Sequence, residues 1–291
     1  MADEVIDKAA VRRSFEHAAS SYDAHAVLQH EVCRRMLERL DYIKLKPTAI
    51  LDAGSGTGNA LPGLMARYPG VPLIALDLAH TMLARARSRL RWWQTLPAMR
   101  PPLHLVCGDM ERLPVKSESV TLVWSNLALQ WMNDLPRTLA ELHRVLAPGG
   151  LLMFSTFGPD TLKELRSAYE QTDGRTHVSR FIDMHDIGDM LVGARYADPV
   201  MDMEQVTLTY PDVRALMREL KAIGARNSTP GRPLALSAKS VLHTVERRYE
   251  VFRREGKLPA TFEVIYGHAW KPQAQRSPTG HRVIDIKAAK T

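Results

Sequence analysis

A run of apolar residues changes to glycine at residues 50–58, which read Ile-Leu-Asp-Ala-Gly-Ser-Gly-Thr-Gly. This change is typical of a buried strand that ends in a turn where the backbone must approach another group closely. A second apolar run, Val71 to Leu76, ends at Asp77, nineteen residues after Gly58. A glycine turn after one strand and a carboxylate after the next are arranged as in a nucleoside-binding α/β half.

The position of Asp52 narrows the kind of ligand. A dinucleotide-binding turn has the spacing G-x-G-x-x-G and presents backbone N–H groups to a pyrophosphate. Here Gly54, Gly56 and Gly58 have the spacing G-x-G-x-G, and Asp52 precedes them. Because that carboxylate would repel a pyrophosphate, we expect a ligand that carries an ammonium group.

Residues 52–58 resemble the first motif of the class I S-adenosylmethionine-dependent methyltransferases. The resemblance implies S-adenosyl-L-methionine as the cofactor. Tyr22 lies at a break in the N-terminal helical pattern and is expected to close over the methionine end. The cofactor-binding residues that the resemblance implies are Tyr22, Asp52, Gly54, Gly56, Gly58, Asp77, Leu78, Asp109, Met110 and Asn126.

The positions that follow successive strands have separate roles in that superfamily. The resemblance implies that Asp77 accepts hydrogen bonds from both ribose hydroxyls and that Leu78 packs on the adenine. It also implies that Asp109 accepts the adenine amino group while Met110 covers the ring. Asn126, after the fourth apolar run, is expected to face the sulfonium and the methyl group.

Further segments resemble a narrower family, the malonyl-acyl-carrier-protein O-methyltransferases of biotin synthesis. These segments are residues 11–15 with 20–23, 126–131, 154–162 and 181–188. The resemblance covers nearly the whole chain. It implies methylation of the free carboxylate of a malonyl thioester on an acidic acyl carrier protein, which gives the methyl ester that primes pimeloyl and biotin synthesis.

Other functions stay open at this stage. The last three segments are also similar to a mitochondrial complex I assembly factor described as a protein arginine hydroxylase, which would bind the cofactor without methylating a malonyl carrier. A small-molecule methyltransferase acting on a quinone precursor or an organic acid would need no carrier. A non-catalytic carrier-binding protein is disfavoured, because the cofactor motifs are intact.

The expected acceptor sets what the catalytic residues must do. A carboxylate with a reference pKa of about 4 is ionised near neutral pH and needs no general base. Because the sulfonium and the carboxylate lose charge in the transition state, we expect a dry pocket with hydrogen-bond donors. Tyr22, Asn126 and Gln130 are the expected catalytic donors. Arg180 or Arg144 could select a carboxylate, although a structural role is the simpler expectation for both.

Apolar runs alternate with helical patterns from about residue 48 to 157. Strands are expected at 48–53, 71–77, 103–107, 119–125 and 149–156, and helices at 58–68, 79–92 and 134–146. The residues Pro148-Gly149-Gly150 are expected to end a helix and lead into a strand. The pattern and the resemblance together predict an α/β fold of the class I methyltransferase (Rossmann-like) type, with seven mostly parallel strands and helices on both faces.

Helical patterns also flank this core. Residues 5–40 and 160–195 read as helices with breaks near residues 20–23 and Gly174, residues 212–222 and 237–255 as helices, and residues 200–210 and 261–270 as strands. We therefore expect an N-terminal helical lid (1–45), a methyltransferase core (46–210 and 260–270), a basic helical cap (211–259) and a tail (271–291).

The positive charge is concentrated in the C-terminal part. The net charge of the chain is +7, and residues 211–291 contain sixteen Lys and Arg against seven Asp and Glu. A basic cap over the site would attract an acidic carrier protein. The expected carrier-binding residues are Arg247, Arg248, Arg253 and Arg254, with Arg218, Lys221 and Lys239 as neighbours.

Composition argues against several other classes of protein. A chain of 291 residues with ordinary apolar and charged fractions can form one large domain. It has no apolar run long enough to span a bilayer and no signal-peptide pattern, so we expect a cytoplasmic protein with no membrane partner. Cys33 and Cys107 make no disulfide framework. His17 and His185 lack partners at metal-ligand spacing, and no nucleic-acid-binding framework is present, so neither a metal nor a nucleic acid is expected.

Overall fold

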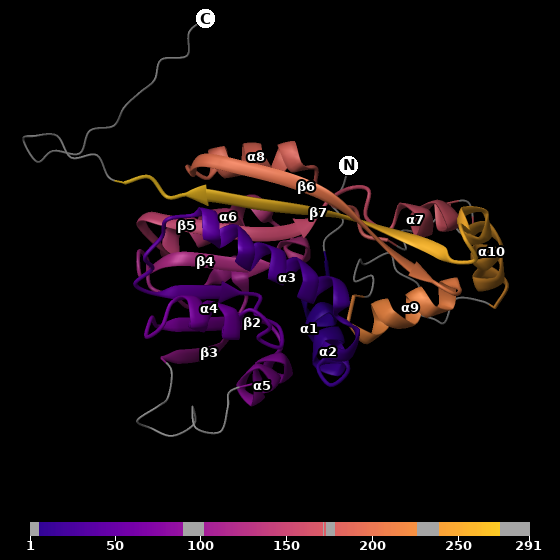
Figure 1. The fold of residues 1–291 in the computed structure, drawn as a ribbon, viewed down its shortest axis with the longest axis horizontal. Helices are drawn as coiled ribbons and strands as arrows, with labels where there is room; N and C mark the ends of the chain where they lie inside the picture. The colour runs from indigo at the N-terminus through magenta and orange to yellow at the C-terminus, as the bar shows by residue number, and fades with distance from the viewer. Residues whose placement is uncertain (1–5, 90–101, 171, 173–177, 226–238, 274–291) are drawn as a thin grey trace, which may run out of the picture.

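Seven strands form a single sheet through the middle of the molecule (Figure 1). The computed structural model describes residues 6–89, 102–170, 172, 178–225 and 239–273. The strands are β1 (Ile50–Ala53), β2 (Leu73–Asp77), β3 (Leu103–Cys107), β4 (Val120–Asn126), β5 (Leu146–Phe157), β6 (Ala197–Tyr210) and β7 (Leu258–Trp270). Their order is β3-β2-β1-β4-β5-β7-β6, and only β7 runs antiparallel to its neighbours. The predicted seven-stranded, mostly parallel α/β sheet is confirmed.

Helices cover both faces of this sheet. They are α1 (Lys8–Ala18), α2 (Tyr22–His25), α3 (Val27–Arg39), α4 (Leu61–Arg67), α5 (His80–Ser88), α6 (Leu135–Val145), α7 (Lys163–Glu170), α8 (Met184–Gly193), α9 (Val213–Ala222) and α10 (Lys239–Tyr249), with short 3-10 turns η1 (Leu40–Tyr42), η3 (Met110–Arg112), η4 (Leu129–Trp131) and η5 (Glu250–Phe252). Successive side chains of β4 point to opposite faces, as the pleat requires. Trp124 packs in the core that contains α3 and α4, and Val123 packs in the core that contains α6 and α8.

The local sequence of α6 explains where this helix begins and which face it buries. Asp134 is the N-cap and its carboxylate accepts a hydrogen bond from the N–H of Arg137 at 2.9 Å. Leu139, Leu142 and Val145, three residues apart, are fully buried. This helical spacing places them on one face against the sheet, as the sequence pattern predicts.

The expected boundary between α6 and β5 is wrong. The helix ends at Val145 and β5 begins at Leu146, so the Pro148-Gly149-Gly150 turn lies inside the strand. Gly149 has a φ of +77°, and the pairing of β4 with β5 shifts register between Val120 and Leu122. The turn therefore interrupts the pairing of β4 with β5 and does not end the helix.

The predicted helix over residues 237–255 is too long. The observed helix, α10, ends at Tyr249. The ring of Tyr249 is fully buried, and its hydroxyl donates to the carbonyl of Pro259 at 2.9 Å. The chain then makes the turn η5 before β7. The expected break near Gly174, the loop at 92–101 and the tail beyond residue 273 lie outside the described residues.

Two helical segments from distant parts of the chain meet beside the sheet. Figure 1 shows α1, α2 and α9 next to one another beside the sheet, and α2 contacts α9. The hydroxyl of Ser21 donates to the carbonyl of Ala222 at 2.9 Å, and Gly224, with a φ of +75°, packs against Phe15. These contacts place the N-terminal helices and the end of α9 over the same edge of the sheet. The division of the chain into lid, core, cap and tail stays a prediction.

Gly58 should be needed for stability. It has a φ of +78°, and a Cβ there would lie 2.7 Å from Leu61 and 2.8 Å from Ala86. We expect Gly58→Ala to lower the free energy of unfolding by about 2–4 kcal/mol, since it combines a left-handed backbone with overpacking. Denaturant titration of the purified variant measures this. Gly70→Ala is the matched control, because Gly70 has the same φ of +78° with open space around it. Equal losses for the two variants would contradict the packing argument.

Candidate active site

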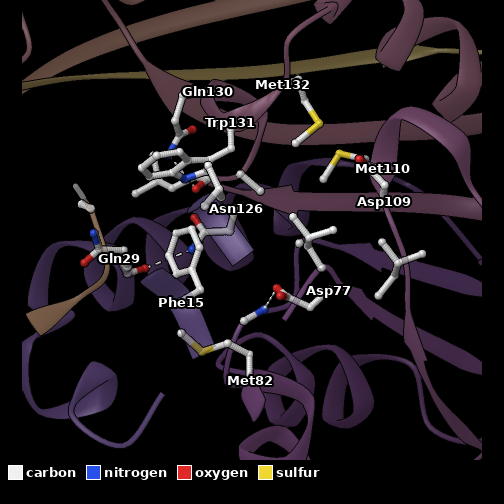
Figure 2. Close-up of a pocket in the computed structure, with 18 of the residues that line it drawn as sticks. Phe15, Gln29, Asp77, Met82, Asp109, Met110, Asn126, Gln130, Trp131 and Met132 are labelled. Atoms are coloured by element: carbon white, nitrogen blue, oxygen red, sulfur yellow. Dashed lines mark hydrogen bonds between the residues drawn. The ribbon is translucent and has the colours of Figure 1, made fainter. Parts of the chain in front are cut away.

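A cavity with about 840 Å³ of empty space lies where β1, β2, β3 and β4 end (Figure 2). We call it the large cavity. The structure brings nine of the predicted site residues to its walls. They are Tyr22, Gly54, Gly56, Asp77, Leu78, Asp109, Met110, Asn126 and Gln130. Figure 2 shows Asp77 and Asp109 on one side and Asn126, Gln130 and Trp131 on the other.

A second cavity of about 360 Å³ adjoins the first at the glycine turn. Asp52 lines this small cavity and does not line the large one. Five residues line both cavities, which makes them two parts of one cleft. These shared residues are Tyr22, Gln29, Gly54, Gly56 and Asn126.

The glycines of the turn have different environments. A Cβ on Gly54 would lie 2.3 Å from the Cβ of Ala128, so this glycine lets the ends of β1 and β4 approach closely. A Cβ on Gly56 would meet nothing within 4 Å, because Gly56 faces the open cleft. Gly58 lines neither cavity and packs against α5. Its positive φ shapes the turn, and its role at the cofactor stays a prediction.

Asp77 holds the glycine turn against the end of β2. Its carboxylate accepts hydrogen bonds from the N–H groups of Gly56 and Ala79, both at 2.8 Å (Figure 2). Burial raises the pKa of Asp77 to about 6, although these backbone donors oppose the rise. A buried carboxylate with remaining acceptor capacity suits the predicted contact with sugar hydroxyls.

Asp52 is the more strongly perturbed carboxyl group. It is 2% exposed, and burial raises its pKa to about 8, with the nearby Asp77 adding to the rise. In the ligand-free protein Asp52 is therefore largely protonated at neutral pH. A cationic group in the small cavity would favour the carboxylate form, which is the behaviour expected of an ammonium-binding site.

Lys8 ties α1 to the far end of the large cavity. Its ammonium lies 3.1 Å from the carboxylates of both Asp109 and Glu111. Asp109 also caps η3 by accepting the N–H of Glu111 through the same oxygen, Oδ1. Oδ2 of Asp109 accepts no hydrogen bond from the described residues, so it is available to the predicted adenine amino group.

Asp23 ties α2 to the glycine turn. Its carboxylate accepts the hydroxyl of Thr57 at 2.5 Å and pairs with Arg89 at 2.7 Å. Arg89 in turn donates to the carbonyl of Thr57 at 2.7 Å. The beginning and the end of the N-terminal helical pair are thus each fixed by an ion pair at the rim of the cleft.

The amide side chains at the end of β4 are held in place. Asn126 donates to the carbonyl of Gln29 at 3.1 Å and accepts the hydroxyl of Ser155 at 2.9 Å (Figure 2). Gln130 donates to the carbonyl of Leu127 at 2.7 Å and accepts the hydroxyl of Thr156 at 3.3 Å. Each NH₂ group has two N–H bonds and uses one, so each keeps one donor for a ligand.

Aromatic rings form much of the remaining wall. Phe15 and Trp131 meet edge to face, with centroids 5.3 Å apart and an interplanar angle of 88°. Burial raises the pKa of Tyr22, and the charges of Asp77 and Asp23 add to the rise, so its phenol is neutral at all ordinary pH. Tyr22 lines both cavities, which is where a residue that closes over the methionine end must lie.

The arginines considered as carboxylate selectors lie outside this cleft. Arg144 donates to the carbonyls of Leu113 and Val115 and pairs with Glu141 at 2.9 Å, a structural role. Arg180 is exposed and lines neither cavity. In the described residues no His, Cys, Asp and Glu cluster could hold a metal, and no helix is long and apolar enough to cross a bilayer.

The predicted carrier-binding arginines are not equivalent. Arg253 pairs with Glu250 at 2.6 Å and also donates to the carbonyl of Gly256 at 2.7 Å. Arg248 is half-buried and donates to the hydroxyl of Thr172 at 3.0 Å. Arg247 and Arg254 are exposed and pair with no carboxylate of the described residues. Their charges are therefore more available than those of Arg248 and Arg253.

Several polar residues in or beside the cleft were not predicted from the sequence. Gln29 and His30 line it from the start of α3, while Lys8 and Asp23 fix the N-terminal helices over it. Local spacing carried no signal for them, because they reach the site only when the helices α1, α2 and α3 pack against the rest of the fold. A polar pair, Gln29-His30, beside the buried Leu28 was the one hint available.

Residues 51–154 match the family model for a methyltransferase domain. The YcgJ protein of Bacillus subtilis has a similar fold, with a TM-score of 0.59 at 14% identity over 84% of this chain and 99% of that chain. The fold and the matched domain define a methyltransferase with the class I, Rossmann-like architecture.

Relatives of similar length define the family more narrowly. The chain is 57% identical over 284 residues to the malonyl-[acyl-carrier protein] O-methyltransferase of Gallionella capsiferriformans, which covers 98% of both chains. It is also 57% identical over 271 residues to that of a Methylovorus species, covering 93% of this chain and 91% of the relative. The chain belongs to the malonyl-[acyl-carrier protein] O-methyltransferase family, which confirms the resemblance found in its segments.

The raised pKa of Asp52 predicts a cost in stability at high pH. Between about pH 4 and 8 the folded protein keeps a proton that the unfolded chain releases, so stability falls as pH rises through this range. Without ligand, the free energy of unfolding of Asp52→Asn minus that of wild type should rise by at least about 1 kcal/mol between about pH 5 and about pH 8. Chemical denaturation at both pH values measures this difference. Asp186→Asn changes an exposed carboxylate and is the control, and parallel curves for wild type and Asp52→Asn would refute the expectation.

Proposed function

We propose that this protein transfers a methyl group from S-adenosyl-L-methionine to the free carboxylate of a malonyl group held on an acyl carrier protein. The observation that carries the proposal is the two-part cleft. The buried Asp52 lines its small cavity, and the carboxylates of Asp77 and Asp109 line its large cavity. Relatives named for methylation of malonyl-acyl carrier protein, similar over nearly their whole length, support the choice of substrate.

The cleft fits the parts of this cofactor. Asp52 offers a carboxylate to an ammonium group in the small cavity, and Asp77 and Asp109 offer acceptors to hydroxyl and amino groups in the large one. The hydroxyl of Ser55, also on the small cavity, is buried without a hydrogen-bond partner among the described residues. When bound, S-adenosyl-L-methionine supplies an electrophilic methyl group on a sulfonium.

The other side of the large cavity suits a carboxylate nucleophile. Such an acceptor is already ionised near neutral pH, so no side chain has to remove a proton. The spare N–H groups of Asn126 and Gln130 can orient it without the strong ion pair that would stabilise its ground state. Rings of Phe15, Trp131 and Phe157 exclude water, which raises the reactivity of the carboxylate as its charge is neutralised.

A labelled methyl group tests the proposed reaction. We expect label from S-adenosyl-L-methionine to appear on malonyl-acyl carrier protein and to be released by ester hydrolysis. Acetyl-acyl carrier protein has the same thioester without the free carboxylate and should stay unlabelled. Label on neither carrier, or label on both, would refute carboxyl methylation of the malonyl group.

The carrier protein is proposed to dock on the exposed basic face of α9. Ile223 and Ala225, at the end of this helix, line the large cavity, and no described residue of α10 does. Figure 1 shows α10 next to α7, at the far right of the view. Arg218 and Lys221 are exposed and pair with no carboxylate of the described residues. Charge near the cavity entrance fixes an acidic partner in register with the site. Arg247 and Arg254 extend the same positive field.

Charge reversal on α9 should weaken the carrier and spare the cofactor. We expect Arg218→Glu with Lys221→Glu to raise the KM for malonyl-acyl carrier protein roughly tenfold at low salt, with a smaller effect at high salt. The dissociation constant for S-adenosyl-L-methionine should be unchanged. Arg85→Glu with Arg87→Glu, an equal reversal on the exposed side of α5, is the matched control. An unchanged carrier KM, or an equal rise in the control, would contradict docking on α9.

A further inference from the structure

His30 is a titratable residue of the cleft to which the proposed reaction gives no task. It lies near the start of α3 and lines the small cavity together with Asp52 and Ser55. Its Nε2 atom is buried and hydrogen-bonds to no group of the described residues, while the ring edge leaves the side chain 34% exposed. A buried polar atom without a partner costs free energy unless a ligand satisfies it.

Two orphaned polar atoms line the same small cavity. They are Nε2 of His30 and Oγ of Ser55, each buried without a hydrogen-bond partner among the described residues, and the carboxyl group of Asp52 lines the same cavity. Asp52 suits a cation, whereas a hydroxyl and an imidazole N–H suit an anion. The small cavity thus offers complementary groups to both ends of a zwitterion.

We propose that His30, assisted by Ser55, binds the α-carboxylate of the cofactor's methionine end, while Asp52 binds its ammonium group. This assignment rests on the proposed use of S-adenosyl-L-methionine. It makes the small cavity selective for an intact amino acid end, which the glycine turn alone does not provide.

The other cation near this cavity is already engaged. Arg89 pairs with Asp23 at 2.7 Å and donates to the carbonyl of Thr57, and it does not line either cavity. Asp23 itself lies 3.9 Å from Nε2 of His30, beyond hydrogen-bonding distance. His30 is therefore the basic side chain on the small cavity that remains available to an anion.

The charged groups that face His30 set its response to pH. Burial lowers the pKa of His30 and Arg89 lowers it further, whereas Asp23 opposes the change. Asp52 lines the same small cavity and is largely neutral without ligand. A bound carboxylate would favour the imidazolium form of His30, and a bound ammonium group would favour the carboxylate form of Asp52. In the wild type, proton uptake by His30 therefore opposes proton release by Asp52.

Two ligands that differ only in the carboxylate test the assignment. The dissociation constants of S-adenosyl-L-methionine and decarboxylated S-adenosylmethionine are measured by calorimetry for wild type, His30→Gln and His30→Arg. We expect His30→Gln to weaken S-adenosyl-L-methionine roughly tenfold or more and to leave the decarboxylated ligand within about twofold. His30→Arg should bind the intact cofactor at least as well as wild type.

The number of protons exchanged when the cofactor binds gives a second test. A purely structural role of His30 would not change this number. Calorimetry in buffers of different ionisation enthalpy reports protons taken up or released. We expect His30→Arg to release more protons per bound ligand than wild type near neutral pH, because arginine keeps the charge but cannot take up a proton. His25→Gln, the same kind of change on α2 outside both cavities, is the matched control.

The outcomes separate this inference from the proposed function. Equal losses for both ligands in His30→Gln, or no loss for either, would overturn the role of His30 while cofactor use stands. Failure of wild type to bind S-adenosyl-L-methionine at all would overturn the proposed function, and the assignment of His30 with it.

Discussion

The close approach of the glycine turn to its neighbours is the constraint on which the cleft depends. Gly54 lets the end of β1 come within van der Waals contact of Ala128, and Gly56 donates its N–H to Asp77 at the end of β2. These contacts bring the ends of β1, β2 and β4 together without side chains between them. The space that remains between the strand ends is the cleft. The tight packing of the turn desolvates Asp52 and Asp77, whereas the Asp109 side chain stays 33% exposed.

Burial of these acids has opposite effects on stability and on binding. Keeping Asp52 and Asp77 out of water raises both pKa values and makes the empty site costly. The same desolvation strengthens any contact with a cationic or donor-rich ligand. The N-terminal helices complete this desolvation, since Lys8 and Asp23 fasten them across the rim through ion pairs to Asp109 and Arg89. Sites of this kind trade stability for affinity.

The sheet and the cofactor positions could be predicted because they depend on local pattern. Strand ends in a parallel sheet meet at one edge, so the positions of Asp52, Asp77, Asp109 and Asn126 after successive strands, together with the superfamily resemblance, predicted that they lie close together. The role of Gly58 could not be read from the sequence, because a glycine needed for its backbone angle looks the same there as one that faces a ligand.

Residues outside the sheet were harder to predict. His30 reaches the cleft only when α3 docks, and no periodicity encodes that docking. The pairing of Arg253 with Glu250 is local, but whether such an i,i+3 pair forms depends on where the helix stops, and here α10 ends at Tyr249.

The position of β7 has a consequence for how the protein is made. β7 lies between β5 and β6, yet it is the last strand along the part of the chain that the structure describes. Until residues 258–270 leave the ribosome, β5 and β6 each present a row of unpaired backbone groups, and β6 has no partner at all. Such edges are prone to pair with other chains. A nascent chain stopped after α10 would therefore depend on chaperones. A C-terminal truncation that removes part of β7 should be far less tolerated than one that removes only residues after Trp270.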